Sequence, residues 1–189
     1  MRTVLFLVAM FGALPTIIAQ QAADVSLTNV ADGSKVSLAN YSSSAGVVVI
    51  FTTNACAYDE YYRARINKLA KEHPGNVPVL LVNASVDAPE SVENMTKAVQ
   101  KWGVSAPYLA DKDQSLMQSL GATKSPQAFV LKNTGGKFTV LYSGAIDDNA
   151  QVEADVRNAY LKEAINSLLS NQKPATTEVR PVGCTIRKK

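Results

Sequence analysis

A strand–helix–strand unit in the first half of the chain constrains the fold more than any other feature. The five apolar residues of 47–51, four of them β-branched, are typical of a strand buried on both faces of a sheet. Apolar residues then recur at helical spacing over 58–69, and a second apolar run covers 77–82. A crossover of this kind makes the two strands parallel, with a right-handed connection. The sequence therefore predicts an α/β fold.

Shorter elements flank this unit on both sides, and their order predicts a mixed sheet. Alternating residues around Asp32-Gly33 indicate an N-terminal β-hairpin, and a Gly-Gly turn indicates a second hairpin late in the chain. The expected elements are a hairpin at 25–38, helices at about 91–102 and 114–120, strands at 127–131 and 138–142, a long helix at about 150–169, and an extended tail from 170.

Composition excludes several classes of protein. The 189 residues are 47% hydrophobic and 19% charged, with a net charge of +3. These proportions suit one globular domain and not a disordered chain. A net charge of +3, mixed along the chain, does not favour a nucleic-acid partner.

The first residues are predicted to be a secretory signal. Arg2 precedes an apolar stretch at 4–19, and small residues near its end offer cleavage after Ala19, Ala22 or Ala23. A membrane anchor is the alternative, but a span needs about 20 apolar residues and a proline interrupts this run.

These features divide the chain into three predicted parts. They are an approximate signal peptide at 1–22, a domain at 23–170 and an extended tail at 171–189 that carries Cys184. We expect the mature protein to be exported, periplasmic or secreted, without stable membrane insertion. An oxidising compartment would allow a disulfide to persist.

Two cysteines and one histidine leave little room for a metal site or a disulfide-rich scaffold. We expect no metal and no organic cofactor. Cys56 follows the first central strand at the start of a helix, where free N–H groups and the helix dipole stabilise a thiolate. Asp59 and Glu60 oppose this effect if they lie close by. The alternative is a buried cysteine that only packs.

Cys184 lies in the tail, 128 residues after Cys56. About 15 extended residues span about 50 Å, and a domain of this size is roughly 40 Å across, so the tail can reach Cys56. A bridge between the two cysteines would be either a structural staple or a redox-active pair. A third possibility is that they never meet.

Ser125-Pro126 precedes the strand at 127–131. A proline can begin a strand, and an X-Pro bond can be cis. A cis bond at Pro126 would place the backbone of its neighbour beside Cys56, where it could pair with an extended disulfide substrate. An ordinary loop proline is the alternative.

Several short stretches occur in a specific order along the chain: 32–33 with 36–38, 51–58, 107–111, 125–126 with 129–131, 144–149, 160–161 and 182–186. Their order resembles a thioredoxin fold, and the details are similar to the redoxin family of the alkyl hydroperoxide reductase/thiol-specific antioxidant type. The last three stretches are similar to a subgroup that ends in a Gly-Cys-Thr-Ile motif. The resemblance implies a thioredoxin-like fold, a central mixed β-sheet flanked by helices with an N-terminal β-hairpin extension.

Several positions depart from these families. Asp59 stands where a thioredoxin has its second cysteine, so no local Cys-x-x-Cys disulfide can form. The subgroup often has His and Pro around its cysteine, where this chain has Ala55 and Ala57.

The peroxidase motif of the family is only partly present. Thr53 matches the threonine of the peroxiredoxin motif, but Val49 occupies its proline position. Ser125 stands near the place of the activating arginine. Arg63 and Arg65 are expected to be solvated residues of the helix surface rather than substitutes.

The resemblance implies a thiol-disulfide oxidoreductase, and the predicted signal segment implies that it is exported. Cys56 would attack a protein or small-molecule disulfide, Pro126 would align the substrate and Cys184 would resolve the intermediate, with a reducing partner protein restoring the thiols. The alternative enzyme is a thiol peroxidase that takes peroxide, with Thr53 hydrogen-bonding the sulfur of Cys56. The alternative of another class is a redox-inactive binding module with the same fold.

Overall fold

The computed structural model describes residues 20–73 and 75–189. The predicted signal segment therefore lies outside the described residues, except for its last three positions. The strands are β1 (Leu27–Asn29), β2 (Lys35–Val36), β3 (Gly46–Phe51), β4 (Val79–Asn83), β5 (Tyr108–Ala110), β6 (Lys124–Ser125), β7 (Gln127–Thr134), β8 (Lys137–Gly144), β9 (Glu178–Val179) and β10 (Cys184–Thr185). The α-helices are α1 (Ala57–Glu72), α2 (Val92–Trp102), α3 (Ser115–Leu120) and α4 (Tyr160–Leu169), and short 3₁₀ turns lie at Leu38–Tyr41, Ala88–Glu90 and Glu153–Asp155.

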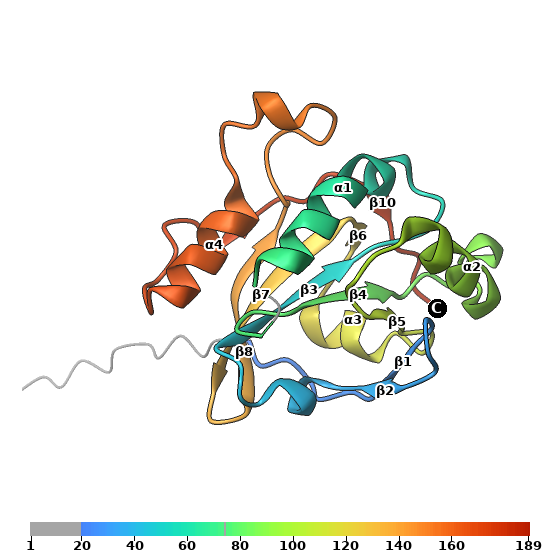
Figure 1. Cartoon of the computed structure of the whole chain (residues 1–189), viewed down its shortest axis with the longest axis horizontal. Helices are drawn as coiled ribbons and strands as arrows, with labels where there is room; N and C mark the ends of the chain where they lie inside the picture. The colour runs from blue at the N-terminus through green and yellow to red at the C-terminus, as the bar shows by residue number, and fades with distance from the viewer. Residues whose placement is uncertain (1–19, 74) are drawn as a thin grey trace, which may run out of the picture.

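Eight strands form one mixed sheet in the order β2-β1-β5-β4-β3-β7-β8-β9 (Figure 1). β3 pairs parallel with β4 and antiparallel with β7, so the predicted strand–helix–strand unit lies at the centre. The thioredoxin-like arrangement and the N-terminal β1–β2 hairpin are confirmed. β6 and β10 form a separate two-stranded sheet.

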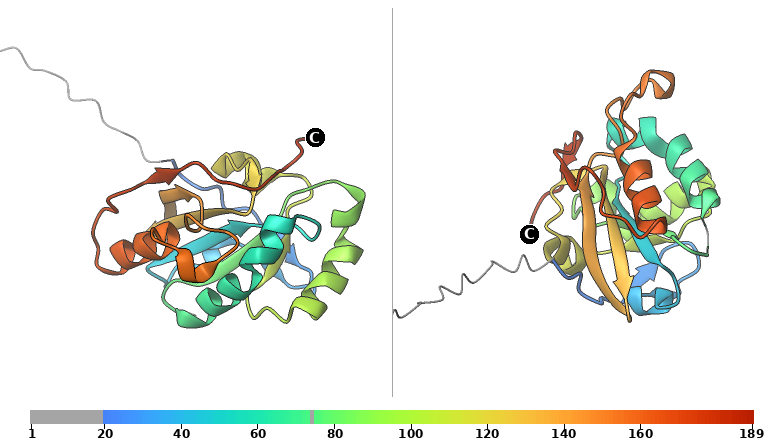
Figure 2. Two further views of the ribbon diagram at one scale, coloured as in Figure 1. Left: turned by 90° about the horizontal axis from the view of Figure 1, so that it is seen from above. Right: turned by 90° about the vertical axis from the view of Figure 1, so that its left-hand side faces the viewer.

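Alternate side chains of β3 enter two hydrophobic cores. Val48 and Ile50 pack on one face, against residues of α1, α2 and α4. Val47, Val49 and Phe51 pack on the other face, against residues of α3 and the N-terminal segment. β3 is therefore buried on both faces, which explains why its sequence is continuously apolar instead of alternating. Figure 2 shows the helices arranged on the two sides of the sheet.

The long helix predicted at 150–169 is wrong over its first half. Only Tyr160–Leu169 is α-helical, and a 3₁₀ turn at Glu153–Asp155 precedes it. Side-chain oxygens bind backbone N–H groups at both ends of this stretch: Asn149 accepts from Gln151 and Val152, and Asp148 accepts from Arg157 and Asn158. Such local bonds compete with helix formation. Asp148 and Asn149 therefore build this loop and do not cap α4, whose N-cap is Ala159.

The tail is extended, as expected, but it forms two short strands that the sequence did not reveal. β9 pairs parallel with the end of β8, and β10 pairs antiparallel with β6. Strand β5 was also missed, because three residues carry too little alternation to recognise.

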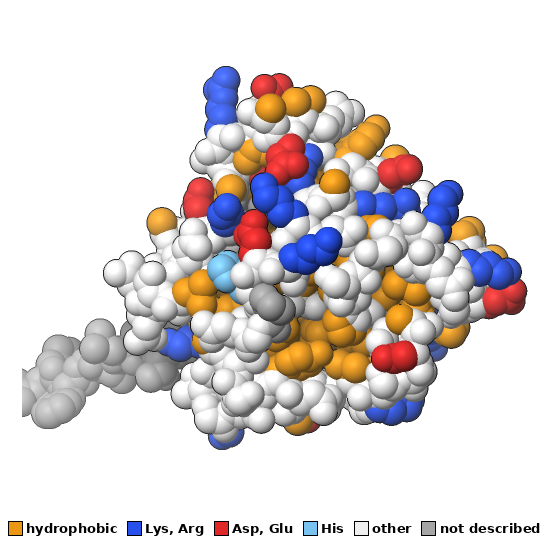
Figure 3. All heavy atoms as spheres, viewed as in Figure 1, with side chains coloured by type: hydrophobic (Ala, Val, Ile, Leu, Met, Phe, Trp, Pro, Cys, Tyr) orange, Lys and Arg blue, Asp and Glu red, His pale blue; other side chains and the backbone are white. Residues whose placement is uncertain are grey.

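Among residues 20–73 and 75–189, no helix has the length and hydrophobicity needed to cross a bilayer. On the face shown in Figure 3, basic and acidic side chains are interspersed.

Candidate active site

The structure joins the two cysteines. Cys56 and Cys184 form a disulfide with an S–S distance of 1.99 Å and a Cα–Cα distance of 6.0 Å. Of the three possibilities left by the sequence, the one in which the cysteines never meet is therefore excluded for this oxidised state. The bridge lies where the C-terminal end of β3 meets the start of α1.

Cys56 is the N-cap residue of α1 and is only 5% exposed. Its position follows from the local sequence, because β3 ends at Phe51 and the helix begins at Ala57. When the disulfide is opened, a thiolate on Cys56 faces the positive end of the helix dipole.

The cis peptide bond allowed by the sequence is present between Ser125 and Pro126. It lies beside the disulfide, since the carbonyl oxygen of Ser125 is 3.4 Å from Cys56 Sγ. Cys184 is directly opposite Ser125 in the β6–β10 pair. The backbone of Ser125, which was predicted to pair with an extended substrate, is therefore paired with the protein's own tail.

Gly183 permits this close pairing. A Cβ atom at this position would lie 2.2 Å from the carbonyl oxygen of Ser125. Any larger residue would therefore force β10 away from β6 or displace the loop that carries Pro126.

A buried carboxyl group lies beneath the site. Asp59 is fully buried and accepts hydrogen bonds from Thr52 Oγ1 (3.0 Å), from the N–H (3.0 Å) and Oγ1 (2.8 Å) of Thr53, and from Ser125 Oγ (2.5 Å). Burial raises the pKa of Asp59 to about 6, although the hydrogen bonds from Ser125 and Thr53 oppose the shift. Asp59 thus joins the end of β3 to the cis-proline loop.

Thr53 belongs to the same network. Its hydroxyl donates to Asp59 and lies 3.2 Å from Ser125 Oγ, and no bond from Thr53 to the sulfur of Cys56 is present in this oxidised state. The four candidate site residues, Cys56, Cys184, Pro126 and Thr53, are nevertheless gathered around one disulfide.

Glu90 is a site residue that the sequence analysis missed. It is buried, and its carboxylate accepts the N–H groups of Asn54 (2.8 Å) and Ala55 (3.0 Å) and the side-chain amide of Asn83 (2.7 Å). Glu90 therefore holds the loop that immediately precedes Cys56. No local sequence signal marks this role, because Glu90 lies 34 residues after Cys56 in the chain.

The expectation that Arg63 and Arg65 are solvated surface residues is wrong. The Arg65 side chain is 10% exposed, and its Nη1 is 2.5 Å from Asp147 Oδ2. Arg63 donates to the carbonyl of Asn54 at 3.1 Å and lies over the ring of Trp102. Both arginines are engaged in structural contacts.

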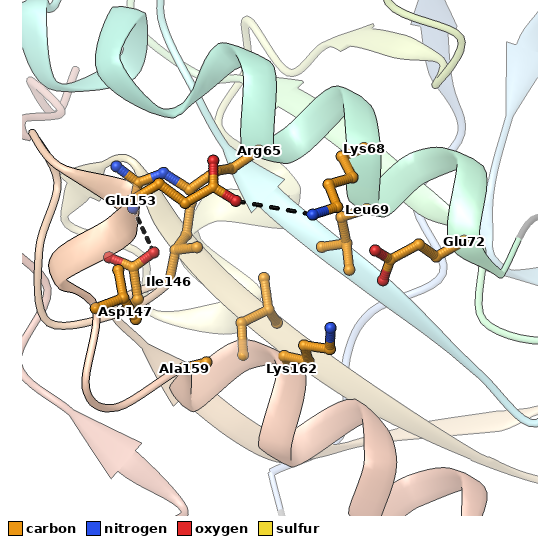
Figure 4. A pocket seen from close by; sticks show the side chains of 11 residues that line it. Arg65, Lys68, Leu69, Glu72, Ile146, Asp147, Glu153, Ala159 and Lys162 are labelled. Carbon is orange, nitrogen blue, oxygen red and sulfur yellow. Dashed lines mark hydrogen bonds and ion pairs between the residues drawn. The ribbon is translucent and has the colours of Figure 1, made fainter.

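Arg65 and Asp147 also line a cavity of about 240 Å³ between α1 and the segment leading into α4 (Figure 4). Lys68 and Glu153, which also line this cavity, form an ion pair at 3.9 Å (Figure 4). None of the four candidate site residues lines this cavity. Over the described part of the chain, no three His, Cys, Asp or Glu side chains group together as metal ligands.

Comparison with known families gives a direct result. The Redoxin family model matches residues 18–160, which is more than half of the chain. The chain belongs to the Redoxin family. The matched region of this redoxin contains Cys56, Thr53 and Pro126, and it ends before Cys184. No curated protein matches the sequence.

Solved structures similar to this redoxin share its fold. A hypothetical protein of Sinorhizobium meliloti is 26% identical, with a TM-score of 0.81 over 93% of this chain and 97% of the other. An uncharacterised conserved protein of Geobacillus kaustophilus is 26% identical, with a TM-score of 0.80 over 90% and 92%. The exposed lipoprotein thioredoxin of Streptococcus pneumoniae is 21% identical, with a TM-score of 0.58 over 76% and 99%. At 21% identity the last likeness concerns the fold alone.

Proposed function

We propose that this redoxin is an exported thiol-disulfide oxidoreductase whose redox couple is Cys56 and Cys184. The observation that carries the proposal is the disulfide itself, with one sulfur at the N-terminus of α1 and the other on a strand paired with the residue before a cis proline. The helix terminus stabilises the thiolate that must leave when the bridge is opened.

Other residues of the site act by position. Pro126 sets the direction of the Ser125 backbone, which holds β10 against the disulfide. Thr53 and Asp59 connect this loop to β3. The substrates are disulfides or dithiols of proteins or small molecules, and a separate redox partner returns the couple to its starting state.

Turnover assays test the proposal. The mature protein is supplied with a reduced thiol donor and a small disulfide, alongside Cys56→Ser and Cys184→Ser. We expect disulfide turnover by the wild type and a large loss in each single variant, because the couple needs both sulfurs to close. Wild-type turnover in both single variants would show that this couple is not catalytic. A disulfide that stays closed in a glutathione buffer would instead indicate a static binding module.

A parallel assay with hydrogen peroxide separates the thiol peroxidase alternative. The side chain of Arg63 is bound to the carbonyl of Asn54 and that of Arg65 to Asp147, so both are engaged away from Cys56. We therefore expect peroxide to react with the reduced protein no faster than with a free cysteine.

Export is part of the proposal. Contacts made by Gln20 and Ala22 distinguish among the three predicted cleavage sites. The carbonyl of Gln20 accepts from Val140, and the N–H of Ala22 donates to Phe138 at 2.9 Å. Ala22 is 5% exposed and packs in the core. Of the three predicted sites, cleavage after Ala19 alone keeps these contacts, so we expect Gln20 as the mature N-terminus in intact-mass analysis of exported protein. A terminus at Ala23 or Asp24 would contradict this.

A further inference from the structure

The two cysteines of the disulfide are unequally exposed. Cys56 is 5% exposed, whereas Cys184 is an exposed residue of β10. An incoming thiolate must approach the sulfur that it attacks, and access is one of the factors that set the rate of exchange.

The tail that covers Cys56 is held by contacts besides the disulfide. Ile186 is 4% exposed, packs in the core shared with α3, and donates its N–H to Thr123 at 2.9 Å. The buried side chain of Gln114 donates to the carbonyl of Arg187 at 2.7 Å and accepts the N–H of Lys189 at 2.9 Å. None of these contacts involves a cysteine, so we expect the tail to stay in place over Cys56 when the disulfide opens.

Basic residues flank Cys184 on the paired strand and in the tail. Lys124 lies on the paired strand and donates to Thr185 at 2.9 Å, and Arg187, Lys188 and Lys189 follow in the tail. One of these cations, Arg187, is paired with Asp87 at 3.5 Å. Exposed cysteines in electropositive surroundings are the reactive ones.

We propose that Cys184, and not Cys56, is the sulfur that exchanges with the substrate, and that Cys56 is the internal sulfur of the couple. This assignment rests on the proposed oxidoreductase function and reverses the order expected from the family resemblance. It makes Cys184 the catalytic residue that contacts the substrate, although it lies outside the region matched by the family model.

The chemistry balances in both directions. A substrate thiolate attacks Cys184 Sγ, a substrate–Cys184 bond forms, the Cys184–Cys56 bond breaks, and its electron pair remains on Cys56 as a thiolate. A second substrate thiolate then attacks the substrate sulfur of the mixed disulfide and releases Cys184. The substrate dithiol is oxidised, the protein disulfide is reduced, and the two thiol protons pass to solvent or to the protein thiolates. Reduction of a substrate disulfide follows the same steps in reverse.

The first test compares single-cysteine variants of the full mature chain. Cys56→Ser leaves Cys184 as the only thiol, and Cys184→Ser leaves Cys56. Each reduced variant reacts with the disulfide dithionitrobenzoate, and the released thiolate is followed by absorbance. We expect Cys184 to react at least about tenfold faster than Cys56 in the folded proteins. In urea the two thiols should react at similar rates, which shows that the folded surroundings cause the difference. A faster reaction at Cys56 overturns the assignment.

The second test uses the intact couple. Oxidised wild-type protein is mixed with excess glutathione, quenched with acid at short times and mapped by mass spectrometry. An early glutathione adduct on Cys184 supports the assignment. An early adduct on Cys56 overturns it and leaves the proposed function standing. If glutathione neither forms an adduct with the protein nor opens the disulfide, the proposed function itself fails.

Discussion

At the residue scale, Asp59 is the clearest departure from the thioredoxin pattern. From the sequence alone, Asp59 is only the residue in place of a second cysteine and a charge that opposes a thiolate. The structure shows a fully buried carboxyl group that accepts four hydrogen bonds from Thr52, Thr53 and Ser125. Its role is to bind the cis-proline loop to the end of β3, which a single sequence cannot reveal because Ser125 is 66 residues away.

Asp59 makes the stability of the protein depend on pH. Its folded pKa of about 6 lies above its ordinary value of 3.8, so the folded state binds the proton more tightly than the unfolded state. The resulting stabilisation is fully present below about pH 4 and is lost as the pH rises through about 6. The free energy of unfolding of the wild type, measured in urea, should fall over this pH range. Asp59→Asn should lack this pH-dependent fall. Equal pH slopes for both proteins between pH 4 and 6 would contradict it.

Gly183 is the residue on which the position of β10 depends. Gly183→Ala places a Cβ 2.2 Å from the carbonyl oxygen of Ser125, and overpacking of this kind costs about 1–3 kcal/mol. We expect the equilibrium constant for closing the disulfide in a glutathione buffer to fall roughly tenfold. Val182→Ala, at a 60% exposed side chain, is the matched control and should leave the constant unchanged. Equal constants in both variants would refute the steric argument.

At the scale of elements, prediction succeeded where local pattern decides the structure. The runs at 47–51 and 77–82 became β3 and β4, and the helix between them became α1. It failed at 150–159, where residues with a helical pattern form a loop. There the side chains of Asp148 and Asn149 accept backbone N–H groups of the loop, and Arg65 donates to the carbonyls of Asn149 and Ala150. Contacts from another element thus override local helix propensity.

The Arg65–Asp147 pair should contribute strongly to stability, since its two side chains are only 10% and 6% exposed. Removing one partner of a buried pair leaves an uncompensated charge and costs about 3–5 kcal/mol. We expect Arg65→Met to lower the free energy of unfolding by this amount. Lys68→Met is the control, because its pair with Glu153 is 68% and 57% exposed and is worth less than about 1 kcal/mol. If both variants lost a similar amount of unfolding free energy, Asp147 would not depend on Arg65 as its charge partner.

At the scale of the whole molecule, the tail passes from one face of the sheet to the other. Val179 packs with the core that contains α1 and α4, and Ile186 belongs to the core that contains α3. Between them Cys184 meets Cys56 at the end of β3. The disulfide therefore closes a loop of 128 residues around most of the fold.

Closing so long a loop restricts the unfolded chain, and the loop model gives a stabilisation of up to about 5 kcal/mol. We expect the oxidised protein to unfold at a higher urea concentration than the reduced protein. Cys184→Ser should unfold at the same concentration with or without reductant.

The reduced protein should nevertheless keep its tail in place. Hydrogen exchange should show the amide of Ile186 protected in the reduced wild type, because its bond to Thr123 and its burial do not depend on the disulfide. Fast exchange at Ile186 after reduction would show that the bridge alone holds the tail, and would also remove the cover from Cys56.

The sequence by itself determined the central strand–helix–strand unit, the place of Cys56 at a helix start and the resemblance to redoxins, since these depend on residues close together in the chain. Only the tertiary structure decided the pairing of Cys56 with Cys184, the burial of Asp59, Glu90 and Arg65, and the occupation of the Ser125 backbone by the tail. These contacts join residues tens of positions apart. They depend on the sheet order and on the path of the tail, which no local periodicity encodes.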